Sequence, residues 1–225
     1  MSLTPSLDRK VVVLTGAGGR LGRVVAAKLI AAGARVAGLD AQPTEDLPEG
    51  VFFQVADLAD ETAVESAFSE VIDRFGAVDG VVHTVGMWGG APFAETTLSE
   101  WETMLNVNLR TTFLVFREAA RRMSTNNGRL VAIASKQGAD GGVAEQGPYS
   151  AGKAGVVRLV ESIAAEYDGR ITASAVAPSM ILFGDESADA QGVSVDAIAD
   201  LCVYLCGDGG TIHNGEVLRA YGTMI

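Results

Sequence analysis

The chain has 225 residues, and its 28 acidic and 17 basic side chains give a formal charge of −11 at pH 7. Nucleic acid and anionic membrane surfaces repel so acidic a protein, and we expect neither as a partner. No run approaches the roughly twenty apolar residues of a membrane span, no signal-peptide pattern follows Met1, and only two cysteines occur, so we expect a cytoplasmic protein.

Short apolar runs typical of strands alternate with longer segments typical of helices along the whole chain. The predicted strands lie near Val11–Thr15, Ala34–Leu39, Val51–Ala56, Val78–His83, Leu130–Ser135, Ile171–Val176 and Glu216–Arg219. Strands that alternate with helices build a parallel sheet through right-handed crossovers. We therefore predict one domain over residues 1–225, of the α/β class: a Rossmann-type, doubly wound, parallel seven-stranded sheet with helices on both faces.

A glycine-rich turn follows the first predicted strand and precedes a helix that closes at Gly33. This order of strand, turn and helix is the context that a dinucleotide-binding motif requires. The glycines let the backbone approach a pyrophosphate, and the helix N-terminus directs free N–H groups at the anion. We therefore predict that a dinucleotide contacts Gly16, Gly18, Gly19, Arg20, Leu21 and Gly22.

Asp40 ends the second predicted strand, beyond the glycine turn. A carboxylate at this place accepts hydrogen bonds from the adenosine ribose hydroxyls. A 2′-phosphate would meet like-charge repulsion from Asp40, so NAD(H) is favoured over NADP(H). Two points stay open, because Arg20 could reach a phosphate or lie in solvent, and Asp40 could be an ordinary solvated strand end.

A tryptophan between glycines follows the fourth predicted strand, in Gly86-Met87-Trp88-Gly89-Gly90. Such a side chain can lie against a planar ring, although plain packing of the indole is the interpretation that we prefer. We take Trp88 and Gln146 as the candidate substrate contacts. The residues between Phe183 and Val193 are polar and loop-like, which indicates a site that is open or covered by a neighbouring subunit.

Two predicted helices carry further features. The run Thr97-Leu98-Ser99-Glu100 has the pattern of a capping box and predicts the start of a long helix that contains Asn108. The segment from Pro148 to Tyr167 is apolar on more than one face, so we expect it to bury two sides. One side would face the sheet, and the other would face a partner subunit or a loop.

Tyr149 and Lys153 are four residues apart in the second of these helices, which puts the phenol and the ammonium on one face, one turn apart. A free tyrosine has a pKa of about 10, and a cation within a few ångströms lowers this pKa by favouring the phenolate. Tyr149 could then act as a general acid or base. Ser135, at the end of an apolar run, could hold a substrate oxygen. This combination indicates carbonyl and alcohol chemistry.

With these motifs the chain resembles the short-chain dehydrogenase/reductase family from Val11 to Gly222. Asn108 opens an Asn-Leu-x-x-x-Phe run, Ser135 ends a Gly-Arg-Leu-Val-x-Ile-x-Ser run, and a Tyr-x-x-x-Lys pair completes the pattern of the family's catalytic tetrad. The resemblance implies that the catalytic residues are Asn108, Ser135, Tyr149 and Lys153. It implies further coenzyme contacts at Asp57, Leu58, Thr84, Val85, Gly86, Tyr149, Lys153, Pro178, Met180 and Ile181.

The family implies a role for each tetrad residue. In the reduction of a ketone to a secondary alcohol, Ser135 would orient the carbonyl and Tyr149 would donate the proton, while the hydride would come from the nicotinamide. Lys153 would lower the pKa of the tyrosine and bind the nicotinamide ribose, and Asn108 would hold a water that links Lys153 to solvent. The family also implies a homodimer or homotetramer.

Two departures from the family pattern carry information. Arg20 replaces the middle glycine of the usual turn, so the turn should differ in detail. The run His83-Thr84-Val85-Gly86 stands where relatives have Asn-Asn-Ala-Gly, so the hydrogen bonds of those amides must be made differently. The only other histidine is His213, and two scattered histidines do not indicate a metal site.

Two other functions stay open at this point. One is reduction of a pterin-like ring, because dihydropteridine reductases have a similar Gly-Trp-x-Gly-Gly run and a reduced lid, although they lack the serine that Ser135 matches. The other is dinucleotide sensing without catalysis, against which the complete tetrad argues.

Overall fold

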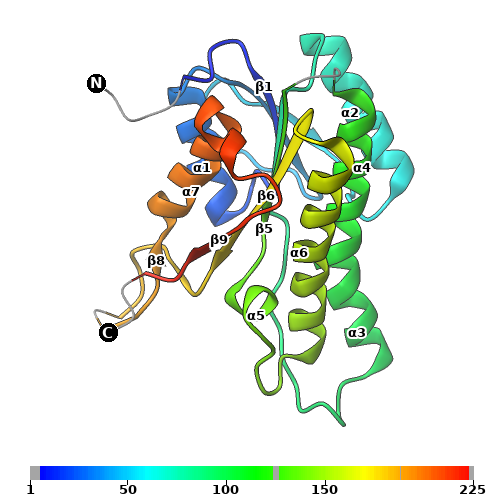
Figure 1. Cartoon of the computed structure of the whole chain (residues 1–225), viewed down its shortest axis with the longest axis vertical. Coiled ribbons are helices and arrows are strands. Elements are labelled where there is room, and N and C mark those ends of the chain that lie inside the picture. The colour runs from blue at the N-terminus through cyan, green and yellow to red at the C-terminus, as the bar shows by residue number, and fades with distance from the viewer. Residues whose placement is uncertain (1–5, 124–126, 188, 223–225) are drawn as a thin grey trace.

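Seven parallel strands form the central sheet of the computed structural model, which describes residues 6–123, 127–187 and 189–222. The order across the sheet is β3, β2, β1, β4, β5, β6, β9 (Figure 1). This order reverses between β1 and β4, which is the switch point at which doubly wound sheets bind ligands. The strands are β1 (Val11–Thr15), β2 (Arg35–Asp40), β3 (Phe52–Val55), β4 (Gly80–His83), β5 (Gly128–Ile133), β6 (Ile171–Pro178) and β9 (Val217–Ala220).

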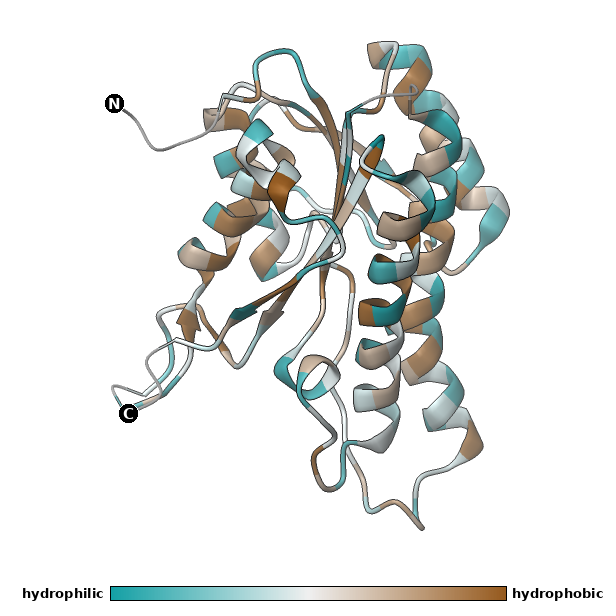
Figure 2. Cartoon of the chain, viewed as in Figure 1, coloured by the Kyte–Doolittle hydropathy of each residue, from teal (hydrophilic) through white to brown (hydrophobic). Residues whose placement is uncertain are grey.

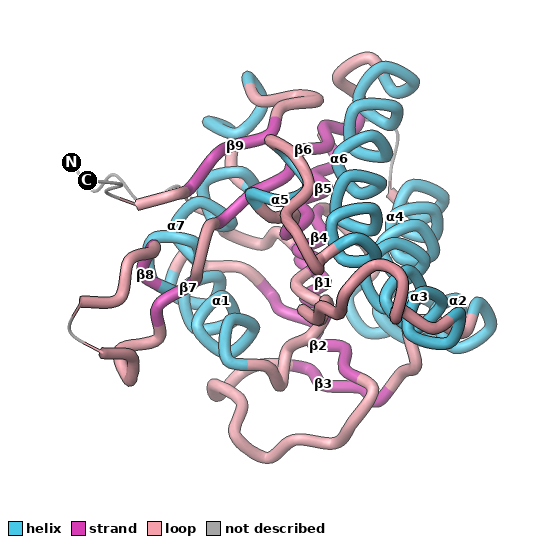
Figure 3. Tube along the Cα trace, turned by 90° about the horizontal axis from the view of Figure 1, so that it is seen from below, coloured by secondary structure: helices cyan, strands magenta, loops and turns pink. Residues whose placement is uncertain are grey.

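Helices cover both faces of the sheet, as seen from below in Figure 3. One face carries α1 (Arg20–Ala31) and α7 (Val195–Cys206), and the other carries α2 (Glu61–Phe75), α4 (Thr111–Arg122) and α6 (Gly147–Tyr167). Each layer encloses its own apolar core against the sheet, and in Figure 2 the helices carry both hydrophobic and hydrophilic residues. Within the described residues, no helix is long and apolar enough to cross a membrane. The predicted fold class is confirmed.

The seven predicted strands are all present, with ends shifted by a few residues. The largest shift is at β5, which begins at Gly128 and ends at Ile133, so Ser135 lies beyond the strand. A two-stranded ribbon of β7 (Ile181–Leu182) and β8 (Val193–Ser194) was not predicted. It brackets the polar segment that the sequence indicated to be a loop, and two-residue strands leave no periodic signal to find.

The long helix that carries Asn108 begins at the predicted capping box. The Thr97 hydroxyl accepts from the Glu100 N–H at 3.2 Å, and the Glu100 carboxylate accepts from the Thr97 N–H at 2.7 Å. The helix is not uniform, because α3 (Leu98–Leu105) continues into α4 through a π-helical turn, η1 (Asn106–Arg110). Such turns widen a helix locally and are frequent at functional sites.

The second apolar side of α6 is covered from within the chain. Gly155 of α6 lies so close to Leu109 of η1 that a Cβ on the glycine would stand 2.7 Å from the leucine side chain. Gly152 meets Asn108 in the same way, at 3.3 Å. The small residues let α6 pack tightly against η1, so this part of the face that the sequence left open to a partner subunit is occupied by the chain's own helix.

Candidate active site

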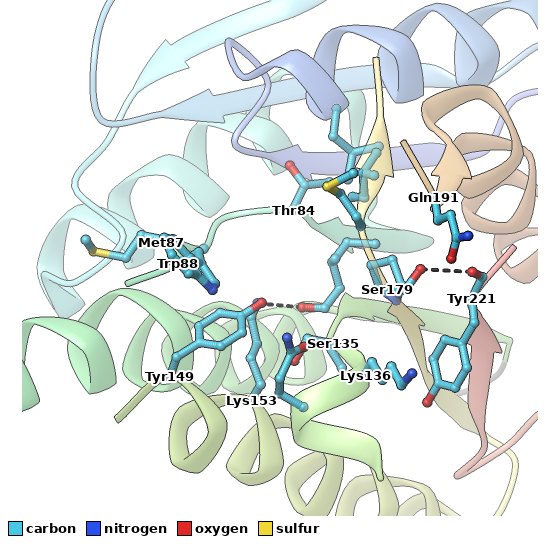
Figure 4. Close-up of a pocket in the computed structure, with 18 residues that line it drawn as sticks. Thr84, Met87, Trp88, Ser135, Lys136, Tyr149, Lys153, Ser179, Gln191 and Tyr221 are labelled. Carbon is cyan, nitrogen blue, oxygen red and sulfur yellow. Dashed lines mark hydrogen bonds between the residues drawn. The ribbon is translucent and has the colours of Figure 1, made fainter. Parts of the chain in front are cut away.

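A cavity of about 670 Å³ opens at the carboxyl ends of the central strands, beside the switch point of the sheet (Figure 4). Its wall comes from segments that are far apart in the sequence, and parallel strands explain this, since their carboxyl ends all meet at one edge of the sheet. The predicted site residues on this wall are Leu21, Thr84, Gly86, Trp88, Ser135, Tyr149, Lys153, Pro178, Met180 and Ile181.

The glycine turn beside the cavity has the shape that a pyrophosphate cradle requires. Gly16 has a φ of 69°, which favours glycine, and its N–H donates to the Leu39 carbonyl at 2.8 Å. A Cβ on Gly22 would collide with the Gly16 carbonyl, so α1 begins directly on the turn. Gly19 is the N-cap of α1 and supplies no capping side chain, which leaves the first helical N–H groups for a ligand.

Asp40 lies under the same turn, at the end of β2. Its carboxylate accepts from the Gly18 N–H at 3.0 Å, so the carboxyl group is held beside the glycines and is not a loose strand end. Sequence reasoning missed Arg23, whose Nε donates to the Gly18 carbonyl at 2.9 Å and whose Nη1 pairs with Asp46 at 3.4 Å. No pattern in the sequence singled out this arginine, because its partners lie on the turn and on a distant loop.

Arg20 is turned away from Asp40. Its guanidinium pairs with Asp185 at 2.7 Å and lies over the Phe183 ring, 4.0 Å from the ring centroid. The first residue of α1 is thus tied to the polar segment that follows β7. The guanidinium is thus paired although the side chain is more than half exposed, and its contact with a phosphate stays a prediction.

Outside the glycine turn and Asp40, which lie beside the cavity and not on its wall except for Leu21, three predicted coenzyme contacts do not line the cavity. The Leu58 side chain is buried in the core between the sheet and α2, and Val85 packs on the same core. Asp57 is exposed, and its carboxylate accepts from the Ala59 N–H at 2.9 Å, which shapes the turn before α2. Leu58 could therefore meet a nucleotide only through its backbone, whereas the exposed Asp57 carboxylate stays accessible.

Ser135, Tyr149 and Lys153 come together where α5 (Lys136–Ala139) packs on α6. Ser135 is the N-cap of α5, and its Oγ accepts from the Gly138 N–H at 3.1 Å. A Cβ on Gly138 would stand 2.5 Å from the Lys153 backbone, so only a glycine lets α5 approach α6 this closely. That approach brings the Ser135 hydroxyl within hydrogen-bond reach of the Tyr149 phenol.

The protonation of the pair differs from what the sequence predicted. Burial raises the pKa of the Tyr149 phenol above its usual 10, and the hydrogen bond with Ser135 offsets only part of that rise. Burial also lowers the pKa of Lys153 to about 8, and its Nζ donates to the Ile133 carbonyl at 2.7 Å. The net shift of the Tyr149 pKa is therefore upward, opposite to the lowering that the sequence predicted, because burial outweighs the hydrogen bond with Ser135.

Asn108 acts on the backbone of the loop that follows β4. Its side-chain amide donates to the Met87 carbonyl at 2.9 Å and the Met104 carbonyl at 3.0 Å, and its Oδ1 accepts from the Met87 N–H at 3.2 Å. A Cβ on Gly86 would stand 2.9 Å from both Asn108 Oδ1 and Lys153 Nζ. The Asn108 side-chain amide is thus engaged with the Met87 backbone, and the water that Asn108 was expected to hold stays a prediction.

His83 replaces the first amide of the family's Asn-Asn-Ala-Gly run with a buried ring. Its Nδ1 is 2.8 Å from the Thr15 hydroxyl on β1, and its Nε2 is 3.2 Å from the Thr111 hydroxyl on α4. Burial first, and the charge of Lys153 second, lower the pKa of the imidazole to about 3. A neutral histidine therefore joins β1, β4 and α4 at the switch point.

The two predicted substrate residues have different outcomes. Trp88 is 66% exposed and lies on the cavity wall, so the preferred interpretation of plain packing is wrong. Trp88 directly follows Met87, whose backbone is fastened by Asn108. Gln146 does not line this cavity and lies at the start of α6 beside Gly90, because the turn before the helix directs it there.

Five polar residues of the cavity wall were missed by sequence reasoning, besides the apolar Met87, Ile133 and Ala134. One signal existed, since Lys136 and Gln137 directly follow Ser135 and begin α5. The other three are Ser179, Gln191 and Tyr221. No sequence pattern indicated them, because they lie after β6, in the loop before β8 and after β9, and only the fold brings them together.

Comparison with known proteins agrees with this geometry. A family model described as short chain dehydrogenase matches residues 10–189. D-threitol dehydrogenase of Mycolicibacterium smegmatis is 30% identical over 94% of this chain and 91% of its own length. Levodione reductase of Leifsonia aquatica is 34% identical over 80% of this chain and 72% of its own length.

Solved structures are similar over nearly the whole chain. A dehydrogenase/reductase from Sinorhizobium meliloti has a TM-score of 0.86 and 26% identity, and the match covers 97% of this chain and 96% of the other. A short chain dehydrogenase from Burkholderia cenocepacia in complex with NADP has a TM-score of 0.84 and 26% identity, with 96% and 98% covered.

Proposed function

Because the chain belongs to the short-chain dehydrogenase/reductase family, whose members are oxidoreductases that use nicotinamide coenzymes on small molecules, we propose that it is an NAD(H)-dependent enzyme that interconverts a ketone and a secondary alcohol. The observation that carries the proposal is the meeting of Ser135, Tyr149 and Lys153 on one cavity wall beside the glycine turn. These groups can orient a carbonyl oxygen and exchange a proton with it.

The residues beside the cavity suit a nicotinamide dinucleotide. The glycine turn and the uncapped start of α1 would hold the pyrophosphate, Asp40 the adenosine ribose, and the segment from Pro178 to Ile181 the nicotinamide. When bound, the coenzyme supplies or accepts the hydride. Asp40 supports NAD(H), because its carboxylate is fixed by the Gly18 N–H and would repel a 2′-phosphate. A structurally similar protein binds NADP, so this preference needs a direct test.

The protonation states support roles for the polar groups. Tyr149 keeps its proton in neutral solution because its pKa is raised, and the protonated phenol is the form that can donate to a carbonyl oxygen. Ser135 receives the Gly138 N–H on its Oγ, and its own O–H, which meets the Tyr149 phenol in this structure, would turn to the same carbonyl oxygen. Asn108 is a positioning residue, since it fixes the Met87 backbone that faces the two groups.

One observation favours a second candidate. The exposed indole of Trp88 stands on the cavity wall, where a planar ring could stack on it. Reduction of a pterin-like ring is therefore kept as the alternative activity. Ser135 distinguishes the two candidate activities. Reduction of a ketone needs the serine hydroxyl to orient the carbonyl oxygen, whereas a pterin ring contains no ketone on which the serine would act.

Self-association is part of the proposal as well. Three large apolar side chains along α3 and α4 are exposed, at Leu98, Trp101 and Phe113. We propose that they lie in the interface of a homodimer or homotetramer. Sedimentation as a monomer at micromolar concentration would contradict this part.

The first experiment is oxidation of NADH and of NADPH over a panel of ketones, acyl thioesters and a quinonoid dihydropterin. We expect NADH-selective turnover of ketones, and a loss of about 100-fold to 10,000-fold in kcat for Tyr149→Phe, because the proton donor is removed. Tyr167→Phe, at the far end of α6, is the matched control.

Two results would change the proposal. Wild-type turnover by Tyr149→Phe would remove the acid/base role. Tight NADH binding without turnover of any compound in the panel would favour a dinucleotide-sensing protein.

A further inference from the structure

Ser135 is held at the start of a very short helix. The helix α5 has four residues, with Ser135 as its N-cap and Asp140 as its C-cap. A single helical turn is unstable by itself, because nucleation costs more than so few hydrogen bonds return. Contacts with other elements must therefore fix α5 and, with it, the Ser135 hydroxyl. One such contact is the close approach of Gly138 to the Lys153 backbone.

The C-terminal end of α5 is fastened to the end of β9. One oxygen of the Asp140 carboxylate accepts from the Tyr221 hydroxyl at 2.6 Å, and the other accepts from Arg219 Nε at 2.7 Å. The hydrogen bond from Tyr221 first, and that from Arg219 second, hold the pKa of Asp140 below its usual value. In neutral solution α5 is therefore joined to β9 through a charged carboxylate.

Tyr221 also contacts the first residue of α5. The Lys136 Nζ lies over the Tyr221 ring, 5.2 Å from the ring centroid, and the charge of Lys136 also lowers the pKa of Asp140. In Figure 4 the Tyr221 ring stands beside Lys136, at the end of the cavity away from Trp88. One tyrosine on the cavity wall thus meets both ends of the helix that presents Ser135.

Tyr221 is itself held by two other segments of the chain. Its carbonyl accepts from the hydroxyl of Ser179, directly after β6, at 2.9 Å, which Figure 4 marks with a dashed line. The next residue, Gly222, approaches the loop before β8 so closely that a Cβ on it would collide with the Gly192 carbonyl. The phenol that binds Asp140 therefore stands on a fixed backbone.

The chain directly after Asp140 gives α5 little support. Two glycines follow, and glycine loses more conformational freedom on ordering than any other residue. Among the described residues, a Cβ on Gly141 would meet no atom within 4 Å, and a Cβ on Gly142 would meet only Ser150, at 4.0 Å. Loss of the Asp140 contacts would therefore leave the C-terminal end of α5 free to move.

We propose that Asp140, held by Arg219 and Tyr221, is a positioning residue that keeps Ser135 in place for the reaction. The inference rests on the proposed function, because it concerns the serine that would orient the carbonyl. Asp140 is not on the cavity wall and acts through α5.

A double-mutant cycle with Ser135 tests this role. With NADH and the ketone that wild type reduces best, we expect Asp140→Ala to lower kcat by about tenfold or more while the KM for NADH stays the same, since a small displacement of an orienting group is costly. In a Ser135→Ala background the same substitution should lower kcat by less than about twofold, because the group that Asp140 positions is gone. Effects that multiply would overturn the inference.

Two further variants separate position from general stability. Tyr221→Phe keeps the ring on the cavity wall and removes only its bond to Asp140, so we expect a smaller loss in kcat that also disappears in the Ser135→Ala background. This variant provides the measurement if Asp140→Ala does not fold. Asp200→Ala is the control, since it removes an ion pair of similar length, 2.8 Å to Lys28, on the other face of the sheet. An equal loss in the control would overturn the inference.

Hydrogen exchange separates this inference from the proposed function. The Gly138 N–H is bonded to Oγ and to the carbonyl of Ser135, both at 3.1 Å, so its exchange reports the position of the serine without turnover. By mass spectrometry we expect the peptide that contains Gly138 to exchange about tenfold faster in Asp140→Ala and at the wild-type rate in Asp200→Ala. Faster exchange would support the inference even if no ketone were reduced. Ketone turnover with unchanged exchange would overturn it and leave the proposed function intact.

Discussion

The two halves of the sheet build their sites in different ways. In the half formed by β1, β2 and β3, the glycine turn and Asp40 lie within 25 residues of one another in the sequence, from Gly16 to Asp40, and hydrogen bonds to the backbone hold them. In the half formed by β4, β5, β6 and β9, the cavity wall comes from six separate segments, and side chains decide its chemistry.

This difference indicates which half would bind any dinucleotide and which half would select a particular substrate. Backbone N–H groups at a turn bind any pyrophosphate, so the first half can serve many enzymes without change. Side chains on loops after the strands can vary while the scaffold stays rigid, so we propose that the second half selects the substrate. The substitutions below test the division, from the largest expected effect to the smallest.

Gly22→Ala tests the backbone character of the first half. The new methyl group would collide with the Gly16 carbonyl, which is backbone and cannot move without opening the turn. We expect NADH affinity to fall by about 100-fold or more, because overpacking at such a site costs several kcal/mol. The measurement is NADH fluorescence titration, with Gly142→Ala as the control, since a Cβ on Gly142 meets no atom closer than 4.0 Å.

A Gly22→Ala protein with wild-type NADH affinity would show that the turn is not the pyrophosphate cradle. Circular dichroism of the same sample distinguishes a loss of affinity from a loss of fold. If folding fails, the milder Gly19→Ala, whose Cβ would stand 3.2 Å from the Gly16 carbonyl, provides the measurement.

His83 lies on β4, where the two halves of the sheet meet, and we expect acid to lower the stability of the protein there. The folded protein holds the imidazole neutral, with a pKa lowered to about 3, whereas the unfolded chain protonates it near 6.5. The unfolded state then binds the extra proton, so this contribution to stability is complete above about pH 6.5 and is lost as the pH falls toward 3. Between pH 7 and pH 5 we expect a loss of about 2 kcal/mol in the free energy of unfolding.

Urea unfolding at pH 7, 6 and 5 measures this loss. Other groups also titrate over the range, so wild type is compared with His83→Asn, which keeps a hydrogen-bonding amide and removes the titration. The variant should lose less stability than wild type between pH 7 and pH 5. Equal slopes for the two proteins would show that the ring is not held neutral in the folded protein.

Asp40→Asn tests the coenzyme specificity that we propose for the first half. An asparagine keeps an oxygen for the Gly18 N–H, so the turn is preserved while the charge is removed. We expect NADPH affinity to rise by about tenfold relative to NADH, which corresponds to about 1.4 kcal/mol of relieved repulsion. Asp46→Asn removes the same charge from a neighbouring exposed position and serves as the control. An unchanged ratio of the two affinities would contradict a role for Asp40 in selecting NAD(H).

Arg20→Ala should have the smallest effect on stability. The ion pair with Asp185 and the stacking on Phe183 are exposed to solvent, where such contacts contribute little. We expect Tm to change by about 2 °C or less. A larger drop would show that the contact between α1 and the segment after β7 stabilises the fold. A tenfold loss of NADH affinity would show instead that Arg20 leaves Asp185 and binds a phosphate.

The success of sequence reasoning follows the same division. The strand and glycine pattern of the first half and the four-residue spacing of Tyr149 and Lys153 are local, so the fold and the place of these residues could be predicted. The protonation of Tyr149, the exposure of Trp88 and the covering of α6 could not. Burial and packing decide each of these, and both depend on segments that are distant in the sequence.

The amino-acid sequence by itself determined the doubly wound sheet, the glycine turn with Asp40, and the set of residues that we propose to orient and protonate a carbonyl. Hydrophobic periodicity, glycine conformational freedom and helical spacing act over a few residues and can be read directly. Only the tertiary structure decided that Lys136, Gln191 and Tyr221 share one end of the cavity and that His83 is neutral. Side chains from distant strands meet there because parallel strands bring their carboxyl ends to one edge, and the resulting burial sets their charge.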